Sequence, residues 1–331
     1  MVIIVYILCL DIGKTKTLAT IVDESGNLFN KIKAGPAGLY LKEDIIVKNL
    51  SEAIEKCLSI SNLTLKDLNL ISISWADLDT PKDWKTAWRI IERIGLKKDK
   101  VLIEHDAVAA YYAVTQGKPG VAVIAGTGSI AYGVNIKGEK ARAGGWGWII
   151  GNEGGASWIT IKALNSVSRA CDGRGEKTTL TEKVKNYFGI INEFEIIDKI
   201  YKELQGNIIK LSEFAKIVDE AANEGDKVAI EILEEGGREL GFTALSVIKR
   251  LNMHYEEIIV GGVGNVFKSR IIKENFMKII KEKTPNAILR EPLIDYQSLL
   301  GPIIIGFKRL GISLPDDVKL ISLLGGNCIG G

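Results

Sequence analysis

Histidine and cysteine are scarce in this chain of 331 residues. Histidine occurs only at positions 105 and 254, and the cysteines at 9, 57, 171 and 328 form no CxxC pair. Zinc and iron–sulfur sites need several such ligands at close spacing. The sequence therefore argues against a metal cluster held within one chain and favours free thiols in a reducing cytoplasm.

A strong charge of either sign is also absent. The chain has 43 basic and 41 acidic residues, and no basic stretch is interleaved with aromatic residues. Proteins that bind nucleic acids usually concentrate positive charge on one face. We therefore expect no nucleic-acid partner.

No apolar run is long enough to cross a membrane. The apolar segment at residues 1–10 is shorter than the roughly 20 residues that a spanning helix needs. It lacks the basic start of a signal peptide, and Asp11 ends it. We interpret it as a buried strand and expect a cytoplasmic protein with no membrane partner.

A repeated pattern of strands and glycine turns is present. Residues 2–32 and 120–144 each predict an apolar strand, a Gly/Thr turn, a second strand, a glycine-bearing turn and a third strand. Two such meanders in one chain indicate a duplicated architecture.

Helices and further strands follow each meander, which is typical of an α/β fold with largely covered sheets. Gly117 and Pro119 suggest a domain boundary near 116–118. The predicted helices are 43–60, 85–95, 107–116, 153–170, 178–188, 193–205, 211–223, 226–252, 266–283 and 297–310, and the further strands are 69–76, 101–106, 257–262 and 287–292.

Two glycine motifs imitate well-known nucleotide sites. Gly13-Lys14-Thr15 looks like the end of a P-loop, but position 8 is leucine where that loop needs glycine, and a strand follows. Residues 126–131 fit a dinucleotide pattern, but the residues after them alternate with period two and predict no helix. The sequence argues against both sites.

The paired Gly/Thr turns remain candidates for phosphate binding. Glycine backbone N–H groups can approach phosphate oxygens because no Cβ is in the way, and threonine hydroxyls add donors. The alternative is two tight turns that bind nothing. Asp11, at the end of the first strand, is an oxygen ligand suited to Mg²⁺.

Asp106 lies where a strand meets a helix. It can act as an N-cap, or as the base that accepts a hydroxyl proton in phosphoryl transfer. The helix N-terminus favours the ionised carboxylate that the second role needs. Position alone leaves both roles open.

Two further segments are rich in glycine. Residues 144–155, GGWGWIIGNEGG, predict either a flexible sugar-binding wall or a linker with core tryptophans. The strand EIIVGGVGN places Gly261, Gly262 and Gly264 at a predicted helix N-terminus. Such a site suits an anion or a nucleotide, although a simple tight turn is the alternative.

Together these motifs resemble a known family. DIGKTKT, HDA, AGTGS, GGWGWIIGNEGG, DEAANEGD and VGGVGN occur in the order found in N-acetylglucosamine kinase-like proteins of the BadF/BcrA-type ATPase family, within the actin–hexokinase–chaperone superfamily. The resemblance covers about residues 5–310. Each motif is unspecific alone, and the combination is specific.

The resemblance implies two actin-like (ribonuclease H-like) domains, each a mixed β-sheet flanked by helices, with ATP and Mg²⁺ in a central cleft. The domains would be 1–116 and 117–296, with the helix at 297–310 packed back on the first domain and a tail at 312–331. The last segment, LLGGNCIGG (323–331), has no readable signal, and we expect it to be loosely ordered.

It also implies the site residues. Asp106 would be the catalytic base and Asp11 the metal ligand; the nucleotide would be bound by Asp11, Gly13, Lys14, Thr15, Gly126, Thr127, Gly128, Gly261, Gly262 and Asn265, and the sugar by Asp106, Ser129, Gly145, Trp146, Gly147 and Asn152.

Three departures from the family pattern affect this site. Lys14 replaces the second glycine of the first loop, Gly38 stands where the family has a sugar-contacting asparagine, and Asn152 replaces an aspartate. Asparagine still bonds hydroxyls but carries no charge. The identity of the sugar is therefore open.

We predict an ATP-dependent kinase for a hexose or amino sugar of the glucose, N-acetylglucosamine or glucosamine type, acting as a homodimer. One alternative is an ATPase that drives a partner protein, like the 2-hydroxyacyl-CoA dehydratase activators. Those hold an iron–sulfur cluster between subunits, and Cys171 has no second cysteine nearby. The other is a sugar-binding regulator, although neither end of the chain predicts a DNA-binding helix-turn-helix.

Overall fold

The computed structural model describes residues 4–204, 207–314 and 317–325. The chain divides into two compact units. Unit 1 contains the chain up to Gly117 and again from Leu293, and unit 2 is the continuous segment 118–292 between them. Unit 2 is thus an insertion in unit 1.

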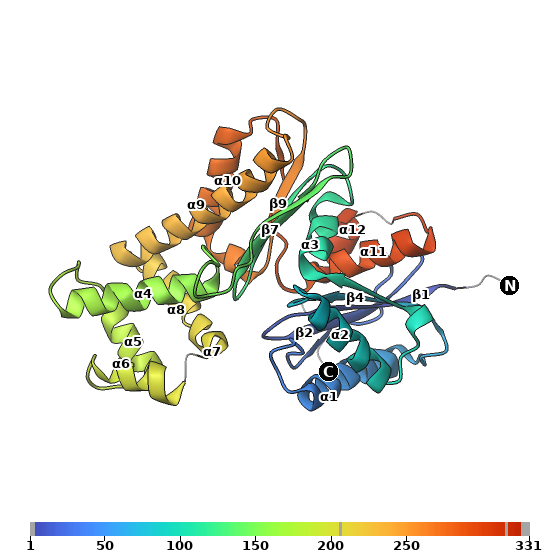
Figure 1. Ribbon diagram of the computed structural model, residues 1–331, viewed down its shortest axis with the longest axis horizontal. Helices are drawn as coiled ribbons and strands as arrows, with labels where there is room; N and C mark the ends of the chain where they lie inside the picture. Colours follow the sequence, from blue (N-terminus) through green and yellow to red (C-terminus); the bar gives the residue numbers. More distant parts are fainter. Residues whose placement is uncertain (1–3, 205–206, 315–316, 326–331) are drawn as a thin grey trace. The chain divides into compact units, whose positions relative to one another are not determined.

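Unit 1 is built on a five-stranded sheet in the order β3-β2-β1-β4-β5. Figure 1 labels β2, β1 and β4 of this sheet. The first three strands are antiparallel, whereas β1, β4 and β5 are parallel. The carboxyl ends of these parallel strands therefore share one edge of the sheet. The strands are β1 (Tyr6–Ile12), β2 (Thr17–Asp23), β3 (Ile32–Ala34), β4 (Leu68–Trp75) and β5 (Val101–His105).

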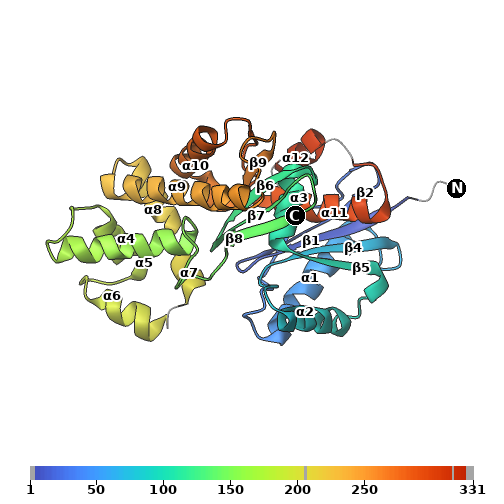
Figure 2. The same cartoon turned by 45° about the horizontal axis from the view of Figure 1, so that its top comes forward.

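Helices cover both faces of this sheet: α1 and α2 lie on one face, and α3 and α11 on the other (Figure 2). The side chains of successive residues of β1 point to opposite faces of the sheet. Leu8 and Leu10 pack in one core with Ile46 of α1, whereas Ile7 lies against Gly306 of α11. The helices are α1 (Glu43–Ser61), α2 (Pro81–Arg93), α3 (Asp106–Thr115), α11 (Leu300–Leu310) and α12 (Asp317–Gly325), with 3₁₀ turns η1 (Lys98–Lys100) and η4 (Asp295–Leu299).

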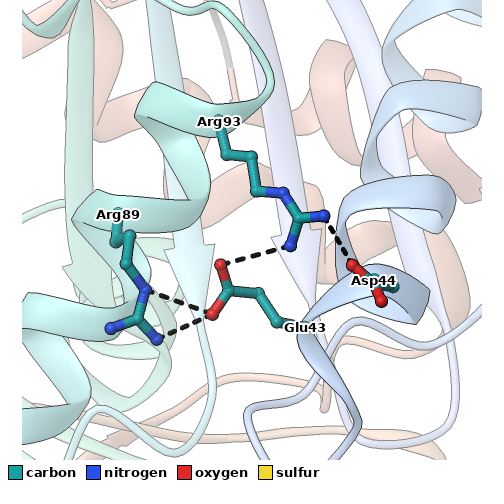
Figure 3. Close-up of polar contacts among 4 residues, drawn as sticks. All are labelled: Glu43, Asp44, Arg89 and Arg93. Atoms are coloured by element: carbon teal, nitrogen blue, oxygen red, sulfur yellow. Dashed lines mark hydrogen bonds and ion pairs between the residues drawn. The ribbon is translucent and has the colours of Figure 1, made fainter.

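A charged network joins α1 to α2 on the surface (Figure 3). Arg89 donates to Glu43 at 2.7 and 3.1 Å, and Arg93 lies 3.4 Å from Glu43 and 2.5 Å from Asp44. Hydrogen bonding from Arg89 is the main cause that lowers the pKa of Glu43. The network fixes the start of α1 against α2.

Unit 2 repeats the topology of unit 1. Its sheet has the order β10-β9-β6-β7-β8, again an antiparallel meander (β6, β7, β8) followed by two parallel strands. The predicted duplication and the predicted α/β class of two mixed sheets flanked by helices are confirmed. The strands are β6 (Gly120–Ala125), β7 (Ser129–Val134), β8 (Lys140–Gly144), β9 (Ile259–Val263) and β10 (Ile288–Leu289).

The long helix α9 covers the β6–β8 meander and packs closely on α10. Gly237 and Gly241 permit this approach. A Cβ on Gly237 would lie 2.6 Å from Ile272 O, and a Cβ on Gly241 would lie 2.7 Å from the side chain of Ile279. The helical segments of unit 2 are α4 (Ala156–Cys171), α5 (Leu180–Phe188), α6 (Glu195–Asp198), the π-helical turn η2 (Lys199–Glu203), α7 (Ile208–Ser212), α8 (Ala215–Asn223), α9 (Lys227–Arg250), the 3₁₀ turn η3 (Asn265–Lys268) and α10 (Arg270–Lys283).

The structure differs from the sequence prediction in several elements. The helix predicted at 193–205 is the short helix α6 followed by the π-helical turn η2, and the helices predicted at 211–223 and 266–283 are each divided in two. The strand predicted at 287–292 is only two residues long, since β10 is an edge strand that pairs with β9 alone. Of the segment 323–331, expected to be loosely ordered, residues 323–325 belong to α12 (Asp317–Gly325), and Leu324 is buried. Residues 326–331, including Cys328, lie outside the described chain.

Candidate functional site

Asp11 lies near the carboxyl end of β1 and points to the α11 face, like Ile7 and Cys9 before it. Ser74 of β4 donates to its Oδ1 at 3.0 Å, and Ser298 of η4 donates to its Oδ2 at 2.7 Å. Burial raises the pKa of Asp11, while the two serine hydrogen bonds oppose the rise. The site therefore holds an oriented carboxylate that lacks a cationic neighbour strong enough to offset burial.

Two more carboxylates follow the neighbouring parallel strands. Asp77 comes two residues after β4, and Asp106 comes directly after β5. The charge of Asp106 contributes to the raised pKa of both Asp11 and Asp77, after burial in each case. Ligands of open α/β sheets bind at this edge. The structure thus brings Asp11 and Asp106 together as predicted for a site, and adds Asp77, which the sequence motifs did not single out.

The junction of β5 and α3 corrects one reading of Asp106. His105, not Asp106, is the N-cap of α3: its Nδ1 accepts a 3.0 Å hydrogen bond from Ala107 N. Asp106 is the first residue of the helix, and its Oδ1 lies 2.9 Å from His105 Nδ1. Its side chain is 25% exposed. The carboxylate of Asp106 therefore does not cap the helix, and it is partly accessible to a ligand.

The first Gly/Thr turn joins β1 to β2. Gly13 N donates to Lys16 O at 2.9 Å and closes the turn, and the side chain of Lys14 pairs with Asp77. In the described chain, the N–H groups of Lys14 and Thr15 and the Thr15 hydroxyl donate to no acceptor. These donors are free for an anion.

The second Gly/Thr turn is fixed on the N-terminus of α4. Ala156 N donates to Gly126 O at 2.9 Å and Ser157 N to Thr127 O at 3.0 Å. A Cβ on Gly155 would lie 2.8 Å from the carbonyl carbon of Gly128, so the close approach needs glycine. Within residues 4–204, no acceptor meets the N–H groups of Thr127 and Gly128 or the Thr127 hydroxyl. This turn, too, offers free donors.

The GNEGG segment belongs to this same turn. Asn152 has a left-handed φ of +66° and is 7% exposed, and its Nδ2 lies 2.6 Å from where a Cβ on Gly128 would be. Ser129 is buried, and its hydroxyl donates to Glu153 O at 2.7 Å. The two motifs, read separately in the sequence, form one local structure in unit 2.

The tryptophan loop is not part of the core. Trp146 is 67% exposed and Ile149 77% exposed. Gly145 and Gly147 both have left-handed backbones, with φ of +72° and +87°. The alternative of a linker with core tryptophans is therefore wrong, and the loop presents apolar side chains to solvent.

The third glycine segment requires a correction of position. Gly261 and Gly262 lie inside strand β9, not at a helix N-terminus, because they pair with Ala122 and Val123 of β6. Gly262 makes room for the ring of Phe267, which a Cβ would meet at under 3 Å. Only Gly264 precedes a helical turn, η3, which begins at Asn265.

Gly264 allows this segment to pack closely against the residue that precedes the second Gly/Thr turn. Its φ is +119°, and a Cβ there would lie 2.4 Å from the carbonyl oxygen of Ala125. Ala125 directly precedes Gly126. The end of β9 and the second turn are thus neighbours within unit 2.

The described residues contain no group of three or more His, Cys, Asp or Glu side chains suited to a metal. A single carboxylate fits Mg²⁺ when nucleotide phosphates and water complete its coordination. Among the same residues, no helix is both long and apolar enough to cross a membrane.

Comparison with known proteins gives relatives that span nearly the whole chain. It is 29% identical over 304 residues to the N-acetylmuramic acid/N-acetylglucosamine kinase of Clostridium acetobutylicum, covering 91% of this chain and 97% of the relative. It is 29% identical over 301 residues to the N-acetyl-D-glucosamine kinase of Dictyostelium discoideum, covering 86% of this chain and 93% of that protein.

The fold is shared with a solved structure. A candidate N-acetylglucosamine kinase from Chromobacterium violaceum superimposes with a TM-score of 0.72 at 18% identity, over 91% of this chain and 98% of that one. The sequence pattern of one family matches residues 8–306. The chain therefore belongs to the BadF/BadG/BcrA/BcrD ATPase family.

Proposed function

We propose that this protein is an ATP-dependent sugar kinase that transfers the terminal phosphoryl group of ATP to a hydroxyl of a hexose or amino sugar. Family membership and two kinase relatives that align over most of their lengths support it. The observation that carries it is the pair Asp11 and Asp106 at the carboxyl edge of one sheet, beside a turn with free donors.

Asp106 is the base in this proposal. Its carboxylate is partly exposed at the start of α3, so it can orient a sugar hydroxyl and accept its proton as the bond to phosphorus forms. Positioning and charge stabilisation account for most of the catalysis of phosphoryl transfer. The protein therefore contributes mainly by positioning the sugar hydroxyl relative to the phosphates of ATP.

Asp11 is the residue that would hold Mg²⁺, directly or through water. Each of its oxygens accepts one serine hydrogen bond, which leaves each oxygen a further lone pair for a cation. When bound, Mg²⁺ neutralises charge on the β- and γ-phosphates. A cation would also offset the burial that raises the pKa of Asp11.

Each unit provides donors of the kind that nucleotide phosphates need. In unit 1 they are the N–H groups of residues 14 and 15 and the Thr15 hydroxyl; in unit 2 they are those of residues 127 and 128 and the Thr127 hydroxyl. Backbone donors in glycine turns suit phosphate oxygens. We assign Gly261, Gly262 and Asn265 to the adenosine side of the nucleotide, on the family resemblance.

Among these sugars we favour an N-acetylated amino sugar, since both relatives act on N-acetylated amino sugars by their names. Asn152 and the loop at 145–147 would contact it, with Trp146 as an apolar surface. Ser129 is buried and already donates to Glu153, so we assign it to support of the turn beside the sugar.

Two further parts of the proposal concern the protein as a whole. We propose that it works in the cytoplasm and forms a homodimer, on the resemblance to its family. Sedimentation velocity at micromolar concentration tests the second part, where a single monomer boundary would contradict it.

A coupled assay of ADP release tests the function. It would use MgATP with a panel of N-acetylglucosamine, N-acetylmuramic acid, glucosamine and glucose. Sugar-stimulated ADP release, with a phosphorylated sugar as product, is expected. ADP release that no sugar changes would indicate an ATPase acting on a partner protein. Sugar binding without ADP release would indicate a sugar-binding regulator.

A further inference from the structure

Lys14, at the tip of the first turn, is held at both ends. Its Nζ lies 2.9 Å from Oδ1 of Asp77, and its carbonyl oxygen accepts a 2.6 Å hydrogen bond from the hydroxyl of Tyr40. The side chain of Lys14 is 40% exposed. A lysine this exposed ordinarily samples many rotamers, whereas here Tyr40 bonds its backbone and Asp77 pairs with its ammonium.

Asp77 occupies a costly conformation to hold it. Its φ is +67°, in a left-handed region that residues other than glycine seldom adopt, although aspartate and asparagine are among those that tolerate it best. Its Oδ2 is shielded from solvent and has no hydrogen-bond partner in the described chain. Strain and an unmade hydrogen bond both cost free energy. Such a combination at a ligand-binding edge points to a functional role.

Tyr40 and Asp77 pack tightly beside Gly38. A Cβ on Gly38 would lie 2.8 Å from the ring of Tyr40 and 3.2 Å from Oδ2 of Asp77. The space beside Gly38 is therefore filled by these two side chains. Tyr40 and Asp77 thus both lie beside Gly38, where Tyr40 bonds the backbone of Lys14 and Asp77 pairs with its ammonium.

The donors around the ammonium of Lys14 indicate an anionic ligand. The neighbouring N–H and hydroxyl of Thr15 are free donors, so the turn presents positive charge and hydrogen bonds to one place. An ammonium has three protons, and one pairing with Asp77 leaves two. These groups match the oxygens of a phosphate, and in the proposed kinase this is the terminal phosphate of ATP.

We propose that Asp77 is a positioning residue for phosphoryl transfer: it holds Lys14 so that the ammonium meets the terminal phosphate of ATP. This inference rests on the proposed kinase function. Because the lysine is already ordered, binding ATP does not have to restrict it. The charge is also in place as the phosphoryl group transfers.

Nucleotide affinity without sugar tests the proposal. Calorimetry would compare a non-hydrolysable ATP analogue with ADP, both with Mg²⁺, for the wild type, Lys14→Met, Asp77→Asn and the double variant. Asparagine tolerates the left-handed backbone, so Asp77→Asn keeps the fold. The matched control is Glu224→Gln, which breaks the Lys183–Glu224 pair, also 2.9 Å long.

Lys14→Met should weaken binding of the ATP analogue about 10- to 100-fold and leave ADP nearly unchanged. Asp77→Asn should weaken the analogue about three- to tenfold, with no further loss when combined with Lys14→Met. Glu224→Gln should bind like the wild type.

Wild-type affinity in Asp77→Asn, even with a lower melting temperature, would overturn the positioning role and leave the kinase proposal standing. Equal losses for ADP and the analogue would also overturn it, because the contact would not be to the terminal phosphate. A wild-type protein that binds neither nucleotide would overturn both proposals.

Discussion

Ser298 donates a 2.7 Å hydrogen bond to Oδ2 of Asp11, although 287 residues separate them in the chain. Ser74, from the neighbouring strand, donates to the other oxygen. The carboxylate that we assign to Mg²⁺ is thus oriented jointly by the centre and the far end of unit 1. Without these bonds, burial would act unopposed by any hydrogen bond from the described chain.

Replacement of Ser298 by alanine should weaken MgATP use. The hydrogen bond lowers the pKa of Asp11, so its loss raises that pKa and disfavours the ionised ligand. We expect kcat/KM for MgATP to fall about three- to tenfold at neutral pH, with the KM for sugar unchanged. Ser168→Ala, which removes only a local bond to Asn165 O, is the control. An unaltered Mg²⁺ titration in Ser298→Ala would contradict the assignment.

Asp106→Asn should abolish most turnover. An amide cannot accept the hydroxyl proton, so kcat should fall about 100- to 10,000-fold, while affinity for an ATP analogue stays within about twofold of wild type. Steady-state kinetics and calorimetry give the two quantities. The exposed Asp198→Asn is the control, and near-normal kcat in Asp106→Asn would remove the base from the mechanism.

Asp11→Asn should change how stability depends on pH. The pKa of Asp11 is raised above its usual 3.8, so the folded protein binds this proton more tightly than the unfolded chain. The resulting contribution to stability is complete below the usual pKa of the carboxyl, and it is lost as pH rises through the raised pKa of the folded protein. Asparagine does not titrate. The free energy of unfolding of wild type minus variant should therefore fall as pH rises from the usual pKa of the carboxyl through its raised pKa in the folded protein.

Urea unfolding at several pH values, without Mg²⁺ or nucleotide, measures this difference. Other titrating groups cancel between the two proteins when they do not interact with position 11. A difference that stays flat or grows with pH would show that the carboxylate is not penalised by burial.

Gly264→Ala should strongly destabilise unit 2. The new Cβ would lie 2.4 Å from Ala125 O at a φ of +119°, which combines overpacking with backbone strain. We expect a loss of about 3–5 kcal/mol. Gly138→Ala is the matched control: its φ is +79° and nothing lies within 4 Å, so strain alone should cost about 1–2 kcal/mol. Equal losses would show that the close approach is unimportant.

Local patterns in the sequence were sufficient for much of the fold. The two meanders, the long helices and the positions of Asp11 and Asp106 at strand ends follow from short-range periodicity and turn residues, and the structure has them. Gly261 and Gly262 were misplaced because glycine inside a strand and glycine at a turn look alike locally. Pairing with β6 decides between them.

Partners far apart in the chain could not be predicted. Ser298 has no motif of its own, and its role depends on the return of α11 to the sheet that contains β1. Asp77 was not singled out from the sequence, and Lys14 was read without it, although each lies two residues beyond the end of one of two neighbouring strands, β1 and β4. The left-handed backbone of Asp77 leaves no trace in the sequence.

The insertion of unit 2 has a consequence for synthesis on the ribosome. Unit 2 is continuous and can fold once residue 292 has emerged, whereas unit 1 must wait for the segment that carries Ser298 and α11. Chains fold domain by domain as they emerge. A chain stopped at residue 292 should contain a protease-resistant unit 2 beside an N-terminal half that is digested, and rapid digestion of both would contradict this order of folding.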